Sequence, residues 1–193
     1  MFKLKLATDP RWVNIVEKNI EEILTDHAYC EQKAASNAIS IIVKWPEHPE
    51  MVSSLLDIAQ EELSHFKMVH DKLLARGYNL GRERKDPYVN LLYEFMKKGG
   101  DRTHQLMDRL MFAAMIEARS CERFKVLSDE INDDDLKEFY RELMISEANH
   151  YAVFLGFARK YGEESYVEKR WNEWLEYEGE IIKQFGVKET IHG

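Results

Sequence analysis

The sequence predicts an all-α fold: a four-helix bundle with one long crossover and additional short terminal helices. Long stretches repeat apolar residues at the three- and four-residue spacing of a buried helix face. Glycine and proline are few, and all four prolines fall where this periodicity stops, so the helices between them are uninterrupted. Glutamate recurs at matching positions on four of the apolar faces, twice with a histidine three residues later. The first two observations predict the helices, and the third predicts that their polar residues share one site.

Length and composition are those of one domain with a substantial core. The chain has 193 residues, of which 45% are hydrophobic. We therefore expect a single domain over residues 1–193, with the core bundle over about 20–162 and an outer C-terminal helix over about 164–185. No stretch approaches the roughly 20 apolar residues of a membrane span, and the N-terminus lacks the apolar run of a signal peptide. We expect a cytoplasmic protein, in which Cys30 and Cys121 are reduced core thiols.

The first two long helices each have a glutamate near the centre of an apolar stripe. The first begins near Asn19 or near Thr25 and ends at Trp45, and the second runs from Pro49 to Gly77. The stripes are Leu24, Ala28, Glu31, Ala35, Ala38, Ile42 and Trp45 in the first helix, and Met51, Leu55, Ile58, Glu62, His65, Val69 and Leu73 in the second.

A long connection separates these helices from the next two. Between Gly77 and Asp101 the pattern loosens around a short apolar segment, residues 88–96, which is typical of the crossover in such bundles. The third and fourth long helices are separated by an acidic turn at residues 132–135, and Gly162 ends the fourth. Their stripes are Leu106, Leu110, Ala113, Glu117, Cys121, Phe124 and Leu127, then Leu136, Phe139, Leu143, Glu147, His150, Phe154 and Phe157, with Gly156 an unexplained interior glycine.

The pattern Glu-x-x-His places both side chains on one helix face, where they can bind the same metal ion. It occurs at Glu62 and His65, at Glu147 and His150, and again in the tail at Glu189 and His192. Only the first two matches have a lone glutamate about 30 residues upstream. These upstream residues are Glu31 and Glu117. The set Glu, Glu-x-x-His, Glu, Glu-x-x-His is the ligand set of a di-iron or di-manganese carboxylate bundle.

Burying four ionised glutamates on apolar faces costs several kcal/mol each unless cations compensate. Two divalent ions would balance four carboxylates, and carboxylate with imidazole but no thiolate favours iron or manganese over zinc. Without metal, desolvation and mutual repulsion should raise some of the glutamate pKa values. We interpret His27, one turn before Glu31, as a satisfied polar residue at the bundle end, with a supporting role beside Glu31 as the alternative.

The net charge of −8 argues against a general nucleic-acid binder. The segment from Lys72 to Arg109, however, contains nine basic and five acidic residues, which gives it a local net charge of +4. This excess is either an ordinary solvated surface or a binding patch. If it is a patch, the best candidates for substrate contact are Arg82, Arg84 and Lys85, beside the turn glycines of the crossover.

Three runs carry a resemblance to a known family: residues 26–35 (DHAYCEQKAA), 77–87 (GYNLGRERKDP) and 117–124 (EARSCERF). With them the chain resembles, over nearly its whole length, the tRNA 2-methylthio-N-isopentenyladenosine hydroxylases, a ferritin-like di-iron family. The resemblance implies that two iron ions are held by Glu31, Glu62, His65, Glu117, Glu147 and His150.

The resemblance also implies an activity. It is that of a monooxygenase that hydroxylates the isopentenyl group of the modified adenosine next to the anticodon, with dioxygen as co-substrate and two electrons from an external reductase. Manganese is the less favoured metal. Two alternatives remain open: a ferritin-like oxidase or peroxidase that acts on small molecules, and a non-catalytic iron-binding or storage protein.

Overall fold

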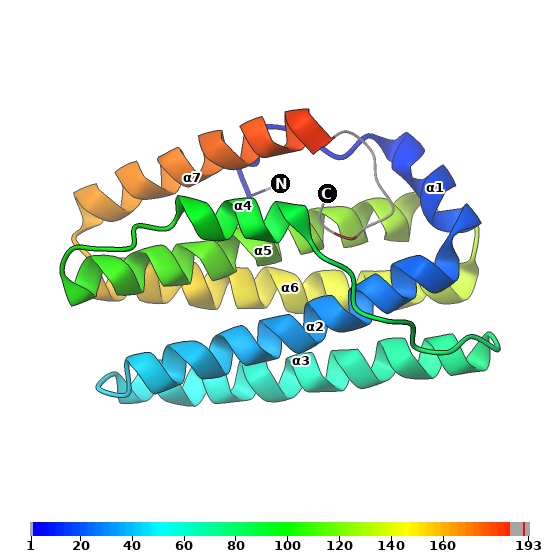
Figure 1. Ribbon diagram of the computed structural model, residues 1–193, viewed down its shortest axis with the longest axis horizontal. Helices are drawn as coiled ribbons and strands as arrows, with labels where there is room; N and C mark the ends of the chain where they lie inside the picture. The colour runs from blue at the N-terminus through cyan, green and yellow to red at the C-terminus, as the bar shows by residue number, and fades with distance from the viewer. Residues whose placement is uncertain (1, 186–190, 192–193) are drawn as a thin grey trace. The chain divides into compact units, whose positions relative to one another are not determined.

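The structure is a computed structural model that describes residues 2–185 and 191. Within these residues it contains seven α-helices, one 3-10 helix and no β-strand (Figure 1). In chain order the elements are η1 (Pro10–Trp12), α1 (Val13–Lys18), α2 (Ile20–Lys44), α3 (Pro49–Ala75), α4 (Pro87–Phe95), α5 (Arg102–Glu130), α6 (Asp134–Tyr161) and α7 (Glu164–Phe185).

The helix boundaries follow local sequence signals. Asp101 and Asp133 cap α5 and α6, each accepting a hydrogen bond from a backbone N–H three residues later. Gly77, with a positive φ of 76°, follows the end of α3. Of the two predicted starts for the first long helix, the earlier is correct, because α2 begins directly after Asn19. The Asn19 side chain makes no capping hydrogen bond and instead donates to the carbonyl of Ile15.

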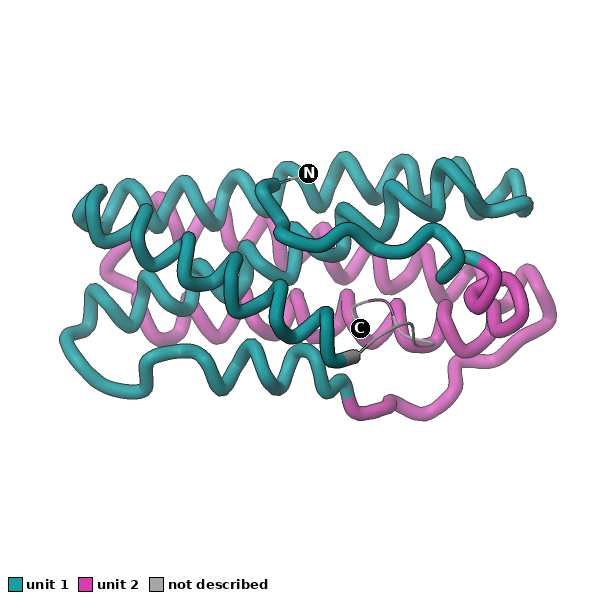
Figure 2. Tube along the Cα trace, turned by 90° about the horizontal axis from the view of Figure 1, so that it is seen from above, with its two compact units in different colours: residues 1–13, 86–188, 192–193 teal, residues 14–85, 189–191 magenta. Residues whose placement is uncertain are grey.

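The chain forms two compact units, which Figure 2 distinguishes by colour. The described part of unit 1 comprises residues 2–13 and 86–185, and that of unit 2 comprises residues 14–85 and 191. In unit 2, α2 packs against α3. In unit 1, α5 packs against α6, and both contact α7. The expectation of a single domain over residues 1–193 stays a prediction.

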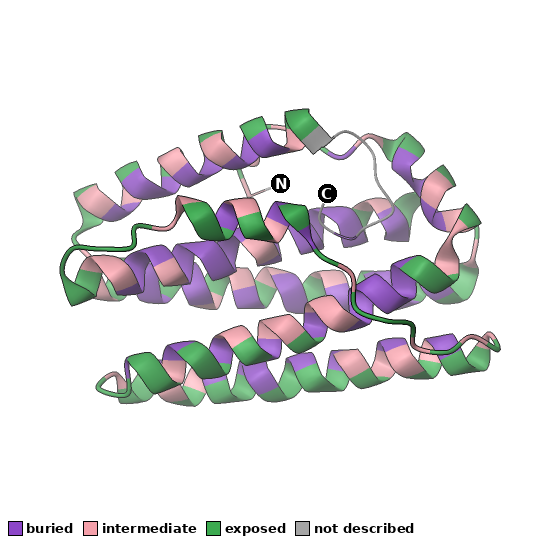
Figure 3. Ribbon diagram, viewed as in Figure 1, coloured by how far each residue is buried: buried purple, intermediate pink, exposed green. Residues whose placement is uncertain are grey.

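The core of unit 2 matches the predicted pair of apolar stripes, except that Ile41 rather than Ile42 is buried on α2. The buried residues include Leu24, Ala28, Ala35 and Ala38 on α2 and Met51, Leu55, Ile58, Val69 and Leu73 on α3 (Figure 3). The segment that follows α3 lies against α2, where the Tyr29 hydroxyl donates to the Gly81 carbonyl at 2.9 Å. A Cβ added at Gly81 would lie 3.2 Å from the Thr25 methyl carbon, which explains the small residue at this approach.

A buried ion network joins distant parts of unit 1. The guanidinium of Arg119, with no exposed surface, donates to Glu178 at 2.6 and 2.8 Å and to Glu122 at 2.9 Å. Glu122 also accepts from the backbone and hydroxyl of Thr8, and Arg119 donates to the carbonyl of Leu6. Because a buried charge is costly unless it is paired, these contacts fix α7 and the N-terminal segment to α5.

A second buried pair in unit 1 lies between α5 and α7. Arg170 donates to both carboxylate oxygens of Asp108 at 2.8 and 2.9 Å. It also donates to the carbonyl of Phe95 at 2.9 Å, and its guanidinium carbon lies 4.3 Å from the centre of the Phe95 ring. This pair therefore connects the end of α4 to both longer helices.

The structure contains no disulfide between the two cysteines, as the sequence predicts. Both cysteines are free; Cys121 is buried and Cys30 is half-buried. Among the described helices, none combines the length and the apolar character needed to cross a membrane.

Candidate metal centre

The first half-site, defined as Glu31, Glu62 and His65, lies between the two helices of unit 2. Glu31 comes from the middle of α2, and Glu62 and His65 lie one turn apart on α3. One potential ligand atom of each residue lies within 4.8 Å of those of the other two. All three residues are buried, with exposed fractions of 4, 0 and 6%. The apolar stripes of α2 and α3 thus bring three metal-binding groups to one buried place.

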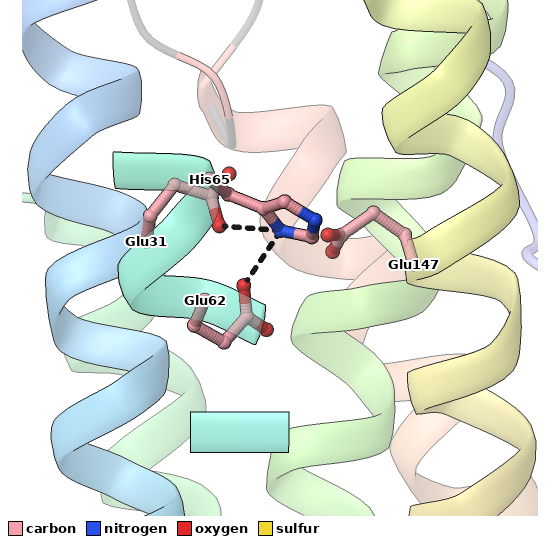
Figure 4. A group of neighbouring side chains, drawn as sticks. All are labelled: Glu31, Glu62, His65 and Glu147. Carbon is pink, nitrogen blue, oxygen red and sulfur yellow. Dashed lines mark hydrogen bonds and ion pairs between the residues drawn. The ribbon is translucent and has the colours of Figure 1, made fainter. Parts of the chain in front are cut away.

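The two carboxylates of this half-site face the same imidazole nitrogen. Nδ1 of His65 lies 3.2 Å from Oε2 of Glu62 and 3.7 Å from Oε2 of Glu31 (Figure 4). The other nitrogen, Nε2, lies 3.8 Å from Oε1 of Glu61. This distance is that of an ion pair and is longer than a hydrogen bond. The geometry is that of one cation position surrounded by two oxygens and a nitrogen.

His27 is the nearest polar neighbour of Glu31 along α2. Its Nε2 lies 2.6 Å from Oε1 of Glu31, and its side chain has no exposed surface. This contact favours the alternative interpretation of His27, a supporting role beside Glu31, over that of a polar residue satisfied at the bundle end. The available signal was the four-residue spacing, which places both side chains on one helix face.

Contacts with His27 and His65 shift the pKa of Glu31 in the opposite direction from the predicted one. Burial alone would raise its pKa, but hydrogen bonds from His27 and His65 lower that pKa well below the usual value of 4.5. Burial alone would lower the pKa of His65, yet its contacts with Glu31 and Glu62 raise it to about 10. The expectation of raised glutamate pKa values is therefore wrong for Glu31. In the metal-free chain a proton on His65 supplies the positive charge that the carboxylates require.

The second half-site, Glu117, Glu147 and His150, lies within unit 1. Glu117 comes from α5, and the Glu-x-x-His pair comes from α6. One potential ligand atom of each residue again lies within 4.8 Å of the others, and the exposed fractions are 3, 3 and 2%. Burial and the nearby charge of Glu147 raise the pKa of the Cys121 thiol to about 12, so it stays protonated at neutral pH. Cys121 donates to the carbonyl of Met144 at 3.1 Å.

Both half-sites suit divalent ions of intermediate hardness. Each offers two carboxylates and one imidazole, and the Cys121 thiol, one turn after Glu117, is protonated and donates to a backbone carbonyl. Oxygen and nitrogen donors in this ratio match iron or manganese. Buried carboxylates also gain more from a bound cation than exposed ones do. The residues that the structure brings together are therefore the six predicted ligands, three in each unit.

The structure places the predicted substrate-contact residues on the segment that follows α3. Arg84 is engaged with Glu22, through an ion pair at 3.1 Å and a hydrogen bond to the backbone carbonyl. Arg82 and Lys85 are exposed, and neither forms an ion pair with a described residue. Arg82 and Lys85 therefore have more freedom than Arg84 to meet an external anion. The tail match at Glu189 and His192 lies outside the described residues.

Comparisons with known proteins agree with these features. A family model described as tRNA-(MS2IO6A)-hydroxylase (MiaE) matches residues 2–193. A Pseudomonas putida protein named tRNA 2-(methylsulfanyl)-N(6)-isopentenyladenosine(37) hydroxylase is 36% identical over 165 residues, which cover 84% of this chain and 78% of that protein. A Salmonella typhimurium protein of the same name is 28% identical over 218 residues, covering 86% of this chain and 77% of that protein.

A solved structure is also similar over almost the full length. It is named Protein 43 with aldehyde deformylating oxygenase activity, from Synechococcus. The TM-score is 0.92 at 28% identity, with 98% of this chain and 95% of that chain covered. This similarity confirms the predicted all-α, ferritin-like fold class.

Proposed function

Because this chain belongs to the tRNA-(MS2IO6A)-hydroxylase family, we propose that it hydroxylates the isopentenyl group of 2-methylthio-isopentenyladenosine next to the anticodon of tRNA. The observation that carries this proposal is the pair of buried Glu, Glu-x-x-His half-sites in a chain that the family model matches from residue 2 to residue 193. The enzyme is an oxidoreductase with tRNA as its substrate.

One iron ion in each half-site is part of the proposal. Glu31, Glu62 and His65 would hold one ion, and Glu117, Glu147 and His150 the other. When bound, the iron supplies the activation of dioxygen for a C–H bond, chemistry that no amino-acid side chain provides. Two electrons come from a separate reductase.

The chain's own residues bind the ion, orient its ligands and exclude water. Glu31 and Glu62 direct one oxygen each toward Nδ1 of His65, and these three groups would hold the ion. Metal binding requires a neutral imidazole, so His65 must release a proton when the ion binds. The near-complete burial of all six ligands keeps bulk water from the reacting group.

Substrate contact is the remaining part of the proposal. Arg82, Arg84 and Lys85 would contact tRNA phosphates and so position the anticodon stem without taking part in the reaction. A tRNA substrate also implies that the enzyme works in the cytoplasm, where tRNA is found.

The Synechococcus protein gives specific support to a second candidate function. Its structure is similar over nearly the whole chain, and the activity in its name is on an aldehyde. An oxidase that acts on a small molecule would use the same six ligands but would have no need of the basic segment. The nucleoside composition of cellular tRNA distinguishes the two functions.

The test uses tRNA from cells with and without this protein. We expect the hydroxylated isopentenyl nucleoside to disappear when the protein is absent and to return with the wild-type gene. It should not return with Glu62→Ala or His150→Ala, one variant for each half-site. Iron analysis of the reconstituted wild type should give about two ions per chain. Unchanged tRNA composition in deficient cells would contradict the tRNA function and favour the small-molecule oxidase.

A further inference from the structure

The segment after α3, residues 77–85, contains no helix or strand and is held in place by α2. Its centre, Gly81, is bound through both polar groups of its backbone. The Gly81 amide donates to Oγ1 of Thr25 at 3.3 Å, and the Gly81 carbonyl accepts from the Tyr29 hydroxyl at 2.9 Å. Thr25 and Tyr29 are four residues apart on α2 and therefore lie on the same face of the helix. Two side chains of one helix thus fix the centre of this segment.

The approach of the segment to α2 leaves little space at Gly81. A Cβ built there would lie 3.2 Å from the methyl carbon of Thr25 and 3.5 Å from its hydroxyl oxygen. Gly81 does not have a positive φ, so alanine could adopt the same backbone conformation. The threonine methyl group is therefore the one neighbour that lies closer to this Cβ than an ordinary contact allows.

Ion pairs with α2 determine which charges of the segment are available to a ligand. Two of its charged residues form such pairs, at 2.9 and 3.1 Å: Glu83 with Lys33, and Arg84 with Glu22. Arg82 and Lys85 are exposed, and neither forms an ion pair within the described part of the chain. The acidic residue of the segment is thus neutralised, while two cations on either side of the ion-paired residues face solvent.

We propose that Thr25 and Tyr29 are positioning residues for the substrate. By holding the backbone at Gly81, they keep the neighbouring cations Arg82 and Lys85 in place for phosphates of the RNA. This inference rests on the proposed function, because it takes tRNA as the ligand. A segment that is ordered before binding loses less conformational entropy when the ligand arrives, so its cations bind phosphate more tightly than the same cations on a loose segment.

The test combines two substitutions at one contact. Gly81→Ala places a Cβ against the Thr25 methyl group and should displace the segment, whereas Thr25→Ser removes that methyl group and keeps the hydroxyl. The probe is an anticodon stem-loop RNA that carries the modified adenosine, titrated into the iron-loaded full-length protein. We expect Gly81→Ala to raise Kd by roughly 3- to 10-fold at about 0.1 M salt, the cost of ordering one or two long side chains. Adding Thr25→Ser should return Kd to within about twofold of Thr25→Ser alone, because the two residues are in contact.

A second variant removes the other hydrogen bond without adding an atom. Tyr29→Phe keeps the aromatic ring and loses only the hydroxyl that donates to the Gly81 carbonyl, so it should also raise Kd. If Gly81→Ala fails to fold, as judged by circular dichroism, Tyr29→Phe decides: a raised Kd supports the inference, and an unchanged Kd overturns it.

The salt dependence of binding distinguishes positioning from direct contact. Gly81→Ala and Tyr29→Phe leave both cations present, so the slope of log Kd against log salt should stay that of the wild type. Charge reversal at Arg82 and Lys85 should weaken the slope by about one to two units, because fewer counterions are released. Iron content and turnover of the free modified nucleoside should not change in Gly81→Ala or Tyr29→Phe, whereas a general structural defect would lower both.

The outcomes separate this inference from the proposed function. If charge reversal at Arg82 and Lys85 raises Kd but Gly81→Ala and Tyr29→Phe do not, the positioning role is overturned and the phosphate contacts stand. If Gly81→Ala raises Kd and Thr25→Ser does not restore it, the role of Thr25 is overturned. If charge reversal has no effect, the phosphate contacts of the proposed function fail, and this inference fails with them.

Discussion

At the residue scale, His27 and His65 lower the pKa of the buried Glu31 carboxyl, so that it can ionise without metal. A single glutamate on an apolar face would be expected to take up a proton. Glu31 instead contacts two histidines, and although burial lowers the pKa of His65, the contacts with Glu31 and Glu62 raise it to about 10. Metal and proton therefore compete for the same position, and metal affinity should rise with pH until His65 is neutral.

The stability of the metal-free protein should show this pairing. His65 has a folded-state pKa of about 10 against an ordinary value of 6.5, so its stabilising contribution is complete below pH 6.5 and is lost as pH rises toward 10. Glu31 has a lowered pKa, so its contribution is complete above pH 4.5 and is lost as pH falls. The two contributions coincide between about pH 4.5 and 6.5.

The measurement is the difference in melting temperature between metal-free wild type and His65→Gln across the pH range. The difference in melting temperature should be largest between about pH 4.5 and 6.5 and should become smaller at lower and at higher pH. A difference that grows from pH 7 to pH 9 would show that His65 is neutral in the metal-free protein.

The six ligands were predictable from sequence because their spacing repeats along the chain: Glu31 with Glu62 and His65, then Glu117 with Glu147 and His150. The role of His27 was not predictable in the same way. A histidine four residues from a glutamate is common on helices, and only the structure shows both side chains buried and in contact.

At the element scale, prolines, apolar stripes and acidic caps locate the helices. They do not reveal which polar residues cross between helices. Arg119 and Glu178 are 59 positions apart, and each is charged, so sequence patterns place both on solvated faces although neither has exposed surface. Contacts of this kind depend on the tertiary packing of α5 and α7, which local periodicity does not encode.

Two glycines near the end of α6 give a matched test of helix packing. Gly156, the interior glycine that the sequence left unexplained, is exposed and has no atom within 4 Å of an added Cβ. A Cβ at Gly162 would lie 2.6 Å from both Met107 Sδ and Val167 Cγ2 and 2.9 Å from the carbonyl oxygen of Ala158. Glycine at position 156 thus lowers helix stability although the surrounding space would accept a larger side chain. At position 162, between α6 and α7, the neighbouring atoms leave no room for a Cβ.

We expect Gly156→Ala to raise the free energy of unfolding by about 0.5–1 kcal/mol, since alanine favours a helix over glycine. Gly162→Ala should lower it by about 1–3 kcal/mol, because the backbone and side chains around the new methyl must move. Denaturant unfolding of both variants with metal removed measures the two changes. Equal effects of the same sign would show that the packing around Gly162 is not specific.

At the scale of the whole molecule, an acidic protein must approach an acidic substrate. The net charge is −8, yet residues 72–109 have an excess of four positive charges. Over distances beyond a Debye length of roughly 10 Å the total charge is screened, so local charge can govern contact. The positive segment could be recognised from the sequence, but the basic side chains that form ion pairs within the protein could not. The structure shows Arg84 bound to Glu22, while Arg82 and Lys85 have no ion pair with any residue in 2–185 or 191.

Charge reversal at Arg82 and Lys85 tests whether these residues contact phosphates. Replacing both with glutamate changes the net charge by −4, from −8 to −12. We expect KM for tRNA at about 0.1 M salt to rise at least roughly 10-fold, and the log–log salt dependence of binding to weaken by about one to two units, because fewer counterions are released. Iron content should be unchanged, since neither residue belongs to a half-site.

The matched control is Lys125→Glu with Lys183→Glu, which changes the net charge by the same amount at two exposed lysines on α5 and α7. If tRNA responds only to total charge, both double variants will raise KM equally. If the segment after α3 contacts the substrate, the change at Arg82 and Lys85 will dominate. A modified nucleoside that lacks the anticodon stem should be turned over equally by both variants, because it has no phosphates to bind. An unchanged KM and salt slope for the variant at Arg82 and Lys85 would leave the local positive excess as ordinary solvated surface.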